Sequence, residues 1–191
     1  MNTEKVKFTG IYRRDLPEAY CVIDIETTGL CHIKNEILEL SALKVRDNSI
    51  VEKFSSLVKP KELIKWGITN LTGITNSMVK NEREIEIVLK EFCDFVGNDV
   101  VVGHNISFDL RFIKAACKKC FEKQFVNDYF DTLKYARKVL PMMGSYKLAN
   151  LANHFSIDTT GHHRGLIDCE ITFAVLKNLI AISNSQKEIS V

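Results

Sequence analysis

The sequence of 191 residues has no long apolar run, no large excess of one charge and no internal repeat. A membrane-spanning helix needs about 20 mostly apolar residues in a row, and no segment approaches that length. The 26 basic and 24 acidic side chains give a net charge of +2, which excludes the strongly basic profile of a protein that coats nucleic acid. We therefore expect a soluble protein, without a membrane partner, whose contacts with any nucleic acid are local.

The six cysteines lack the paired spacing of a disulfide scaffold. Most of them lie inside apolar segments, so we expect a reducing, cytoplasmic location. Cys117 and Cys120 form a CxxC pair within a helical pattern, but no second pair is present to complete a zinc shell. Helix packing is the more frequent role of such a pair.

The composition, with 46% hydrophobic and 26% charged residues, is typical of one globular domain. The first strong apolar segment begins near Tyr20, and periodic patterns end near residue 183. We therefore expect an N-terminal extension (1–18), a single domain (19–183) and a frayed C-terminal tail (184–191).

Periodicity predicts a hairpin-rich first half and an alternating second half. Strands are expected at 20–25, 36–46, 50–58, 100–102 and 125–130, the first three antiparallel because a turn-prone segment joins the second to the third. Residues 70–75 are turn-rich, and helices are expected at 84–96, around 110–117, and at 132–139, 147–155 and 164–183. This pattern indicates an α/β fold with one mixed five-stranded sheet flanked by helices.

The pair Asp24 and Glu26 is the first candidate for chemistry. Alternate side chains of a strand share a face, so the two carboxylates project together while Ile23 and Ile25 point the other way. Neighbouring carboxylates in an apolar strand are costly unless a cation compensates, and oxygen ligands suit Mg²⁺ or Mn²⁺. A strand with a solvated polar face is the alternative, and this pair alone would favour it.

Two further aspartates occur where elements meet. Asp109 follows a polar loop at the start of a helix, and Asp168 lies early in the last helix. Four carboxylates could thus converge on one site. His163 lies five residues before Asp168, about 140° around a continuous helix, so we expect it to precede the helix. There it could take a proton from water, or be a surface histidine beside His162.

Three segments resemble the exonuclease motifs of the DEDDh superfamily: VIDIETTGL (22–30), VGHNISFDLRFI (102–113) and HRGLIDCEIT (163–172). The connecting segments are similar to those of bacterial DNA polymerase III proofreading exonucleases: LTGITNSMV (71–79), DTLKYARKVLP (131–141) and KLANLANHF (147–155). The resemblance covers about residues 20–183. It implies a ribonuclease-H-like fold and a 3′-to-5′ exonuclease that releases nucleoside 5′-monophosphates from single-stranded DNA in proofreading or repair.

The resemblance also implies residue roles. The metal-binding acids correspond to Asp24, Glu26, Asp109 and Asp168, which would hold two divalent ions, Mg²⁺ or Mn²⁺, with Asp24 touching both. The implied general base is His163 rather than His162, because it alone has the motif's offset from Asp168. The implied substrate groove contains Thr27, Thr28, Gly29, Leu30, His104, Asn105 and Phe108.

Several of these roles have plain structural alternatives. His104 and Asn105 could hydrogen-bond their own loop, and Phe108 could pack in the core beneath it. Gly165 stands where the family usually has alanine, and we expect this change to loosen the histidine loop. The implied partners are single-stranded nucleic acid, DNA in preference to RNA, and a DNA polymerase subunit. An RNA-trimming member of the superfamily and a non-catalytic nucleic-acid-binding or polymerase-docking module are the alternative functions.

Overall fold

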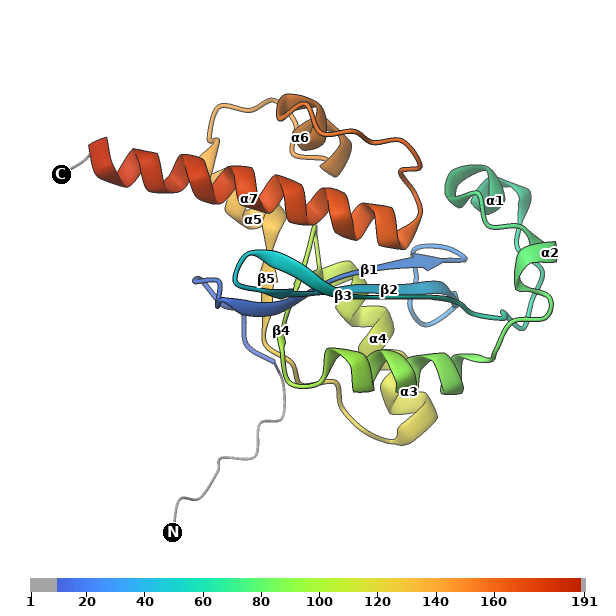
Figure 1. Ribbon diagram of the computed structural model, residues 1–191. Coiled ribbons are helices and arrows are strands. Elements are labelled where there is room, and N and C mark those ends of the chain that lie inside the picture. Colours follow the sequence, from blue (N-terminus) through green and yellow to red (C-terminus); the bar gives the residue numbers. More distant parts are fainter. Residues whose placement is uncertain (1–9, 190–191) are drawn as a thin grey trace, which may run out of the picture.

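The computed structural model describes residues 10–189, which form a five-stranded mixed sheet with helices on both faces (Figure 1). The strands are β1 (Ala19–Thr27), β2 (Ile37–Arg46), β3 (Ser49–Leu57), β4 (Val100–Gly103) and β5 (Tyr129–Asp131). Their order is β3-β2-β1-β4-β5. The first three strands are antiparallel, whereas β4 is parallel to β1 and β5 to β4. The predicted mixed sheet and its antiparallel start are confirmed.

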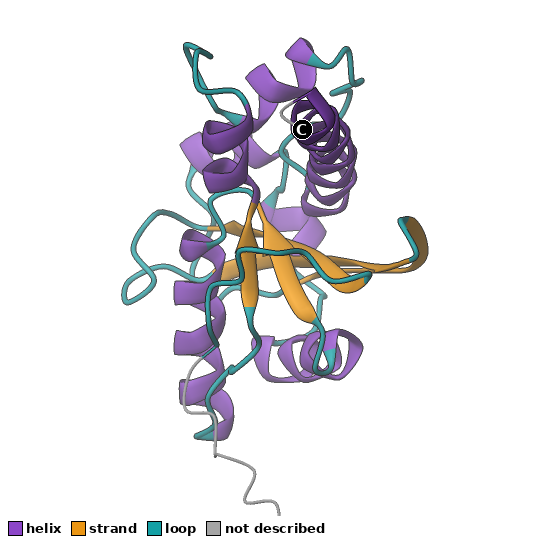
Figure 2. Cartoon of the chain, turned by 90° about the vertical axis from the view of Figure 1, so that its left-hand side faces the viewer, coloured by secondary structure: helices purple, strands orange, loops and turns teal. Residues whose placement is uncertain are grey.

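Two helical layers cover the sheet. The helices are α1 (Trp66–Thr72), α2 (Asn76–Val79), α3 (Ile85–Val96), α4 (Ser107–Phe121), α5 (Thr132–Val139), α6 (Leu148–His154) and α7 (Gly165–Ile189). The long helix α7 crosses β1 and β2 and carries α5 and α6 on its side, while α3 and α4 cover the opposite face. Figure 2 shows the sheet edge-on between these layers.

The alternation of β1 decides which side chains reach which layer. Cys21, Ile23 and Ile25 belong to the buried cluster under α3 and α4. Tyr20 and Val22 belong instead to the cluster beneath α7. Side chains of even number on β1 therefore face α7, and Asp24 and Glu26 continue this series toward the N-terminal end of that helix.

Residues 70–75 are less irregular than the sequence predicted. Helix α1 extends to Thr72 and ends at Gly73, whose φ of 71° is the left-handed cap conformation that glycine adopts readily. Helix α2 follows at once, and the Thr75 hydroxyl accepts from the backbone N–H of Met78 as its N-cap. The turn-prone residues of this segment, Asn70 and Gly73 among them, concealed the helical conformation.

The fifth strand is shorter than predicted. It covers only Tyr129–Asp131, while Phe125, expected to lie within it, is a core side chain beneath α4. The apolar character of Phe125 therefore reflects burial without strand pairing. The last helix is longer than predicted, because α7 continues through Ile189 instead of ending at residue 183.

Part of the expected N-terminal extension adds to the edge of the sheet. Tyr12 forms a parallel bridge with Tyr129, and the backbone N–H of Ile11 donates to Asp128 at 2.8 Å. Residues 1–9 of that extension and residues 190–191 of the tail lie outside the described residues. In the described part of the chain, no helix is long and apolar enough to cross a membrane.

Candidate active site

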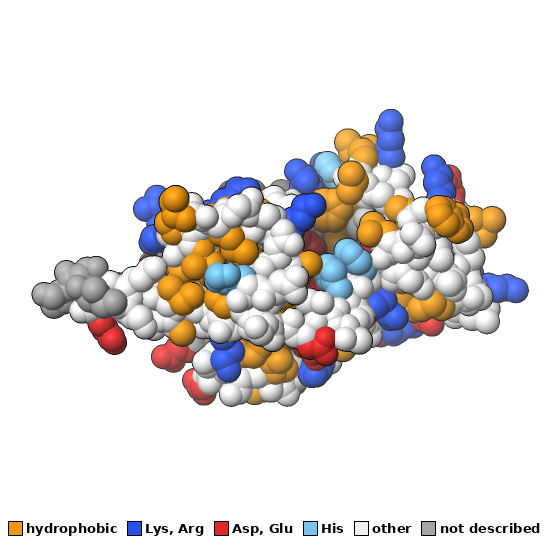
Figure 3. Space-filling view, turned by 90° about the horizontal axis from the view of Figure 1, so that it is seen from above, with side chains coloured by type: hydrophobic (Ala, Val, Ile, Leu, Met, Phe, Trp, Pro, Cys, Tyr) orange, Lys and Arg blue, Asp and Glu red, His pale blue; other side chains and the backbone are white. Residues whose placement is uncertain are grey.

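Three carboxylates meet between the end of β1 and the start of α7. Oxygen atoms of Asp24, Glu26 and Asp168 all lie within 4.8 Å of one another. The strand brings the first two side chains to one face, and Asp168 points back from the first turn of α7. Seen from above, the molecule has a hollow near its centre with histidine, apolar and basic side chains around it (Figure 3).

The fourth predicted acid, Asp109, lies beside this group but is not one of the three. It is in the first turn of α4 and is 5% exposed. Its Oδ1 accepts a hydrogen bond from the backbone N–H of Ile25 at 3.2 Å. Its charge nevertheless acts on Asp24, since it is the largest electrostatic cause of that residue's raised pKa. The structure thus brings four acids into one region and joins three of them closely.

Asp24, Glu26 and Asp109 resist ionisation in this setting. Burial, followed by the charges of Asp109 and Asp168, raises the pKa of Asp24 well above its usual range. Burial and the charge of Asp168 raise the pKa of Glu26 to about 8, and burial raises that of Asp109 to about 7. Like charges in a poorly solvated site oppose one another, so a cation between the carboxylates would stabilise them.

Two adjacent histidines close the site on the α7 side. The Nδ1 atom of His162 contacts Oδ1 of Asp168, whereas His163 reaches Oδ2 through its backbone N–H at 3.3 Å. The two rings stack with their centroids 4.0 Å apart. As predicted, His163 precedes α7, and its φ of 71° is in the left-handed region. Burial and the neighbouring His162 lower the pKa of His163, which favours the neutral, proton-accepting ring.

The turn after β1 carries the first group of expected substrate residues. Thr27 donates from Oγ1 to the carbonyl of Gly29 at 2.8 Å, and Thr28 Oγ1 accepts from the backbone N–H of Glu36 at 2.9 Å. These bonds hold the turn in shape. Leu30 is 85% exposed at its tip, where an apolar side chain is available to a ligand.

The loop before α4 carries the second group. Both ring nitrogens of His104 have protein partners, Thr132 Oγ1 at 3.0 Å and the carbonyl of Tyr146 at 2.8 Å. The backbone N–H of Asn105 donates to Asp131. Phe108 packs at the edge of the core, with its ring centroid 5.1 Å from that of Phe112. Asn105 bonds within its loop, since its carbonyl accepts from the N–H of Phe108 at 3.0 Å, and Phe108 packs against the core, as their structural alternatives predicted. His104 instead bonds to α5 and to the segment after it, and contact of these residues with substrate stays a prediction.

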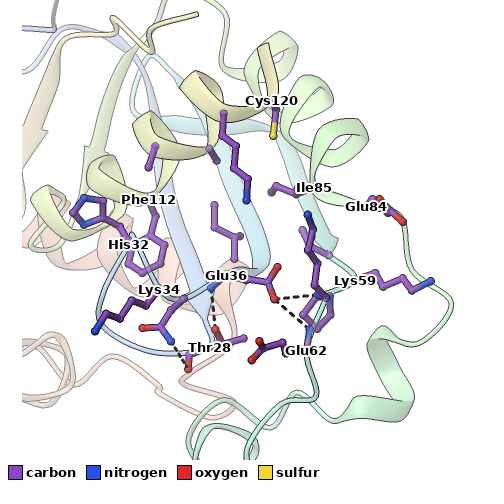
Figure 4. A pocket seen from close by; sticks show the side chains of 18 of the residues that line it. Thr28, His32, Lys34, Glu36, Lys59, Glu62, Glu84, Ile85, Phe112 and Cys120 are labelled. Atoms are coloured by element: carbon purple, nitrogen blue, oxygen red, sulfur yellow. Dashed lines mark hydrogen bonds between the residues drawn. The ribbon is translucent and has the colours of Figure 1, made fainter. Parts of the chain in front are cut away.

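A cavity of about 720 Å³ lies on the other side of the turn after β1 (Figure 4). Its wall includes Thr28, Glu36, Lys59 and Glu62 together with Phe112, and none of the four clustered acids. Both lysines and glutamates line the cavity, so its charge favours neither anionic nor cationic ligands. Thr28 is the residue it shares with the expected substrate groove.

Sequence reasoning missed two residues next to the acids. Glu39 of β2 is 1% exposed and lies opposite Glu26 in the strand register. Arg164, between His163 and α7, makes an ion pair with it. An acid in the segment 37–43, where Ser41 is the one other polar residue, was the available signal. We expected Gly165 to loosen the histidine loop. Gly165 itself is buried, and its backbone N–H donates to Glu39 at 3.2 Å, which holds this end of the loop in place.

The mixed sheet with carboxylates between β1 and α7 defines the ribonuclease-H-like nuclease architecture. The exonuclease family model RNase_T matches residues 21–176, and the chain belongs to this family. It is 41% identical over 165 residues to DNA polymerase III subunit epsilon of Aquifex aeolicus, covering 86% of this chain and 82% of that protein. The match to DNA polymerase III PolC-type of Bacillus subtilis is 34% identical over 92% of this chain, but spans only 12% of that longer protein.

Solved structures agree with this assignment. Exonuclease X in complex with 5′ overhanging duplex DNA superimposes with a TM-score of 0.71 and 29% identity, over 86% of this chain and 93% of that one. E. coli Exonuclease I in complex with a dT13 oligonucleotide has a TM-score of 0.77 over 91% of this chain and 43% of that one. At 18% identity, the latter match supports the fold alone. The predicted resemblance to polymerase III exonucleases is confirmed.

Proposed function

We propose that this chain is a metal-dependent 3′-to-5′ exonuclease that removes nucleoside 5′-monophosphates from single-stranded DNA. The observation that carries the proposal is the convergence of Asp24, Glu26 and Asp168 within 4.8 Å, with Asp109 beside them, at the end of the sheet. Four acids drawn from three elements would not be held together so closely by folding alone, because their mutual repulsion is destabilising.

The donor set fits a hard divalent cation. It consists of carboxylate oxygens, which suit Mg²⁺ or Mn²⁺ better than metals that prefer sulfur or nitrogen. Asp24, Glu26 and Asp168 would hold the ions, with Asp109 beside them. Bound there, two divalent ions would polarise the scissile phosphate, lower the pKa of the attacking water and stabilise the departing oxygen.

The histidine next to α7 supplies the proton acceptor. His163 takes a proton from the attacking water, whose oxygen forms a bond to phosphorus while the bond from phosphorus to the 3′ oxygen breaks. The neutral ring favoured by its lowered pKa is the form that this step requires. The departing 3′ oxygen takes up a proton from solvent water and becomes the new 3′ hydroxyl of the shortened strand, and a nucleoside 5′-monophosphate is released.

The substrate proposal comes from the relatives. Exonuclease X and Exonuclease I have been solved with DNA that includes single-stranded segments, and the epsilon relative is a DNA polymerase III subunit. We extend both properties to this chain, as DNA cleavage associated with a polymerase in proofreading or repair. In this proposal Leu30 and Phe108 contact the terminal bases, and Thr27, Thr28, Gly29, His104 and Asn105 line the path of the strand.

The decisive experiment compares wild-type protein with Asp24→Ala on a 5′-labelled single strand with Mg²⁺ or Mn²⁺. Wild-type protein should shorten the strand stepwise from its 3′ end, and a matched RNA should be cleaved more slowly. The folded variant should lose at least roughly 10²- to 10³-fold in rate. A suitable control is Asp94→Ala, since Asp94 is an exposed acid of α3 paired with Lys90. Equal rates for wild type and Asp24→Ala would refute the proposal.

A further inference from the structure

Glu39 is a buried acid that the proposed mechanism does not use. It is 1% exposed and faces Glu26 across the β1–β2 pair, so both side chains project toward α7. Its charge is also among the causes that raise the pKa values of Asp24 and Glu26. An uncompensated carboxylate at this position would add a further negative charge to a site already crowded with acids.

Glu39 is, however, fully hydrogen-bonded. Arg164 donates from Nε to Oε2 and from Nη2 to Oε1, both at 3.2 Å. The backbone N–H of Gly165 also donates to Oε2, and the Ser55 hydroxyl donates to Oε1 at 3.0 Å. Each carboxylate oxygen thus receives two hydrogen bonds, and the forked geometry is the one in which arginine binds a carboxylate most specifically.

This ion pair joins the centre of the sheet to the segment that carries the proposed base. Arg164 directly follows His163 and directly precedes α7, and its carbonyl accepts from the backbone N–H of Asp168 at 3.0 Å. The partners Glu39 and Arg164 are 125 residues apart in sequence. Holding Arg164 against β2 therefore fixes the start of α7 and the backbone of His163 at the same time.

We propose that Glu39 and Arg164 are positioning residues of the active site: together they hold His163 and Asp168 in register with Asp24 and Glu26. The guanidinium also offsets part of the charge of Glu39, so that the acids facing the ligand are repelled less. This inference rests on the proposed exonuclease function and adds to it two residues that touch neither metal nor substrate.

The two halves of the pair should not be equivalent. Removing Arg164 leaves a buried, unpaired carboxylate beside three others, whereas removing the charge of Glu39 leaves an arginine whose side chain is 40% exposed and can reach water. Arg164→Met should therefore be the more damaging variant, and adding Glu39→Gln to it should restore function. An ion pair that acted only by attraction would show no such rescue.

The experiment measures Arg164→Met, Glu39→Gln, the double variant and Arg164→Lys for kcat, KM and Mn²⁺ affinity. Lys53→Met is the matched control, because Lys53 also links the sheet to α7, through Glu170 at 2.5 Å, but is half exposed. We expect Arg164→Met to lower kcat or Mn²⁺ affinity about 10- to 100-fold with little change in KM. The double variant should recover at least about threefold of this loss, Arg164→Lys should retain part of the activity, and Lys53→Met should stay within about twofold of wild type.

Amide hydrogen exchange gives a readout that does not depend on activity. The N–H of Gly165 should exchange at least about tenfold faster in Arg164→Met than in wild type or Lys53→Met. If wild-type protein has no nuclease activity, the proposed function fails, while exchange and Mn²⁺ affinity still decide the role of the pair. Should Arg164→Met fail to fold, the same comparison is made with Arg164→Lys and Glu39→Gln.

Two results would overturn the inference. One is a set of variants with lowered melting temperature but wild-type kcat, Mn²⁺ affinity and Gly165 exchange, which would reduce the pair to a stabilising contact. The other is a double variant as impaired as the product of the two single effects, which would mean that Glu39 and Arg164 act separately.

Discussion

The imidazole of His162, and not that of His163, hydrogen-bonds the carboxylate of Asp168, while His163 donates to the same carboxylate from its backbone N–H. The motif resemblance assigns the base to His163, so geometry and motif single out different neighbours. His162→Ala and His163→Ala separate them.

We expect His163→Ala to lower kcat roughly 10²- to 10⁴-fold, the usual contribution of a general base, and His162→Ala to lower it little. Single-turnover rates on a labelled single strand at saturating Mg²⁺ give the ranking. The opposite order would transfer the role of base to His162.

The acidic cluster predicts an unusual dependence of stability on pH. The pKa of Glu26 is raised to about 8 in the folded protein, above about 4.3 for an unfolded chain. Between these values the folded state binds more protons than the unfolded state, so the free energy of unfolding falls as pH rises through this window. In EDTA, the melting temperature should therefore decrease from about pH 5 to about pH 8.

Divalent ions should reverse this trend, because they stabilise the ionised carboxylates. Mn²⁺ should raise the melting temperature more at about pH 8 than at about pH 5, and Glu26→Gln should flatten the slope measured in EDTA. A metal-free protein that became more stable across that window would contradict the proposed electrostatics of the site.

Gly165 at the start of α7 lies against Ser41 of β2, with little room for a larger side chain. A Cβ at Gly165 would lie 2.7 Å from Oγ and 3.0 Å from Cβ of Ser41. Gly165→Ala should therefore destabilise the protein by about 1–3 kcal/mol, the usual range for overpacking a core. Thermal and urea unfolding measure the loss, and the double variant with Ser41→Gly should recover part of it. No loss in the single variant would show that the start of α7 can move away from β2.

We predict that Leu30 contacts the bound substrate and the transition state equally well. Its side chain is 85% exposed in the described structure, so its removal should not affect folding. Leu30→Ala should raise KM about three- to tenfold and leave kcat nearly unchanged, since only binding is lost. Val51→Ala, an exposed apolar residue of β3, is the control. A fall in kcat at constant KM would place Leu30 in the chemical step instead.

Local periodicity was sufficient for much of the fold. The antiparallel start of the sheet and helices α3, α5 and α6 follow from patterns that repeat over about two or more helical turns or over several strand residues. It failed where turn-prone residues lie in short helices, as at α1 and α2, and at Phe125, where burial in the core resembles a strand pattern. Pairing of Tyr12 with Tyr129 was also beyond it, because that contact joins distant segments.

The sequence by itself determined that Asp24 and Glu26 share a face of β1, since strand geometry alternates side chains whatever the rest of the chain does. Motif order determined the family. Only the tertiary structure decided that Glu39 lies opposite Glu26, that Arg164 closes over it and that His162 meets Asp168. These contacts depend on how β2 and α7 pack against each other. Because Glu39 and Arg164 are 125 residues apart in the sequence, no local sequence pattern predicts that they meet.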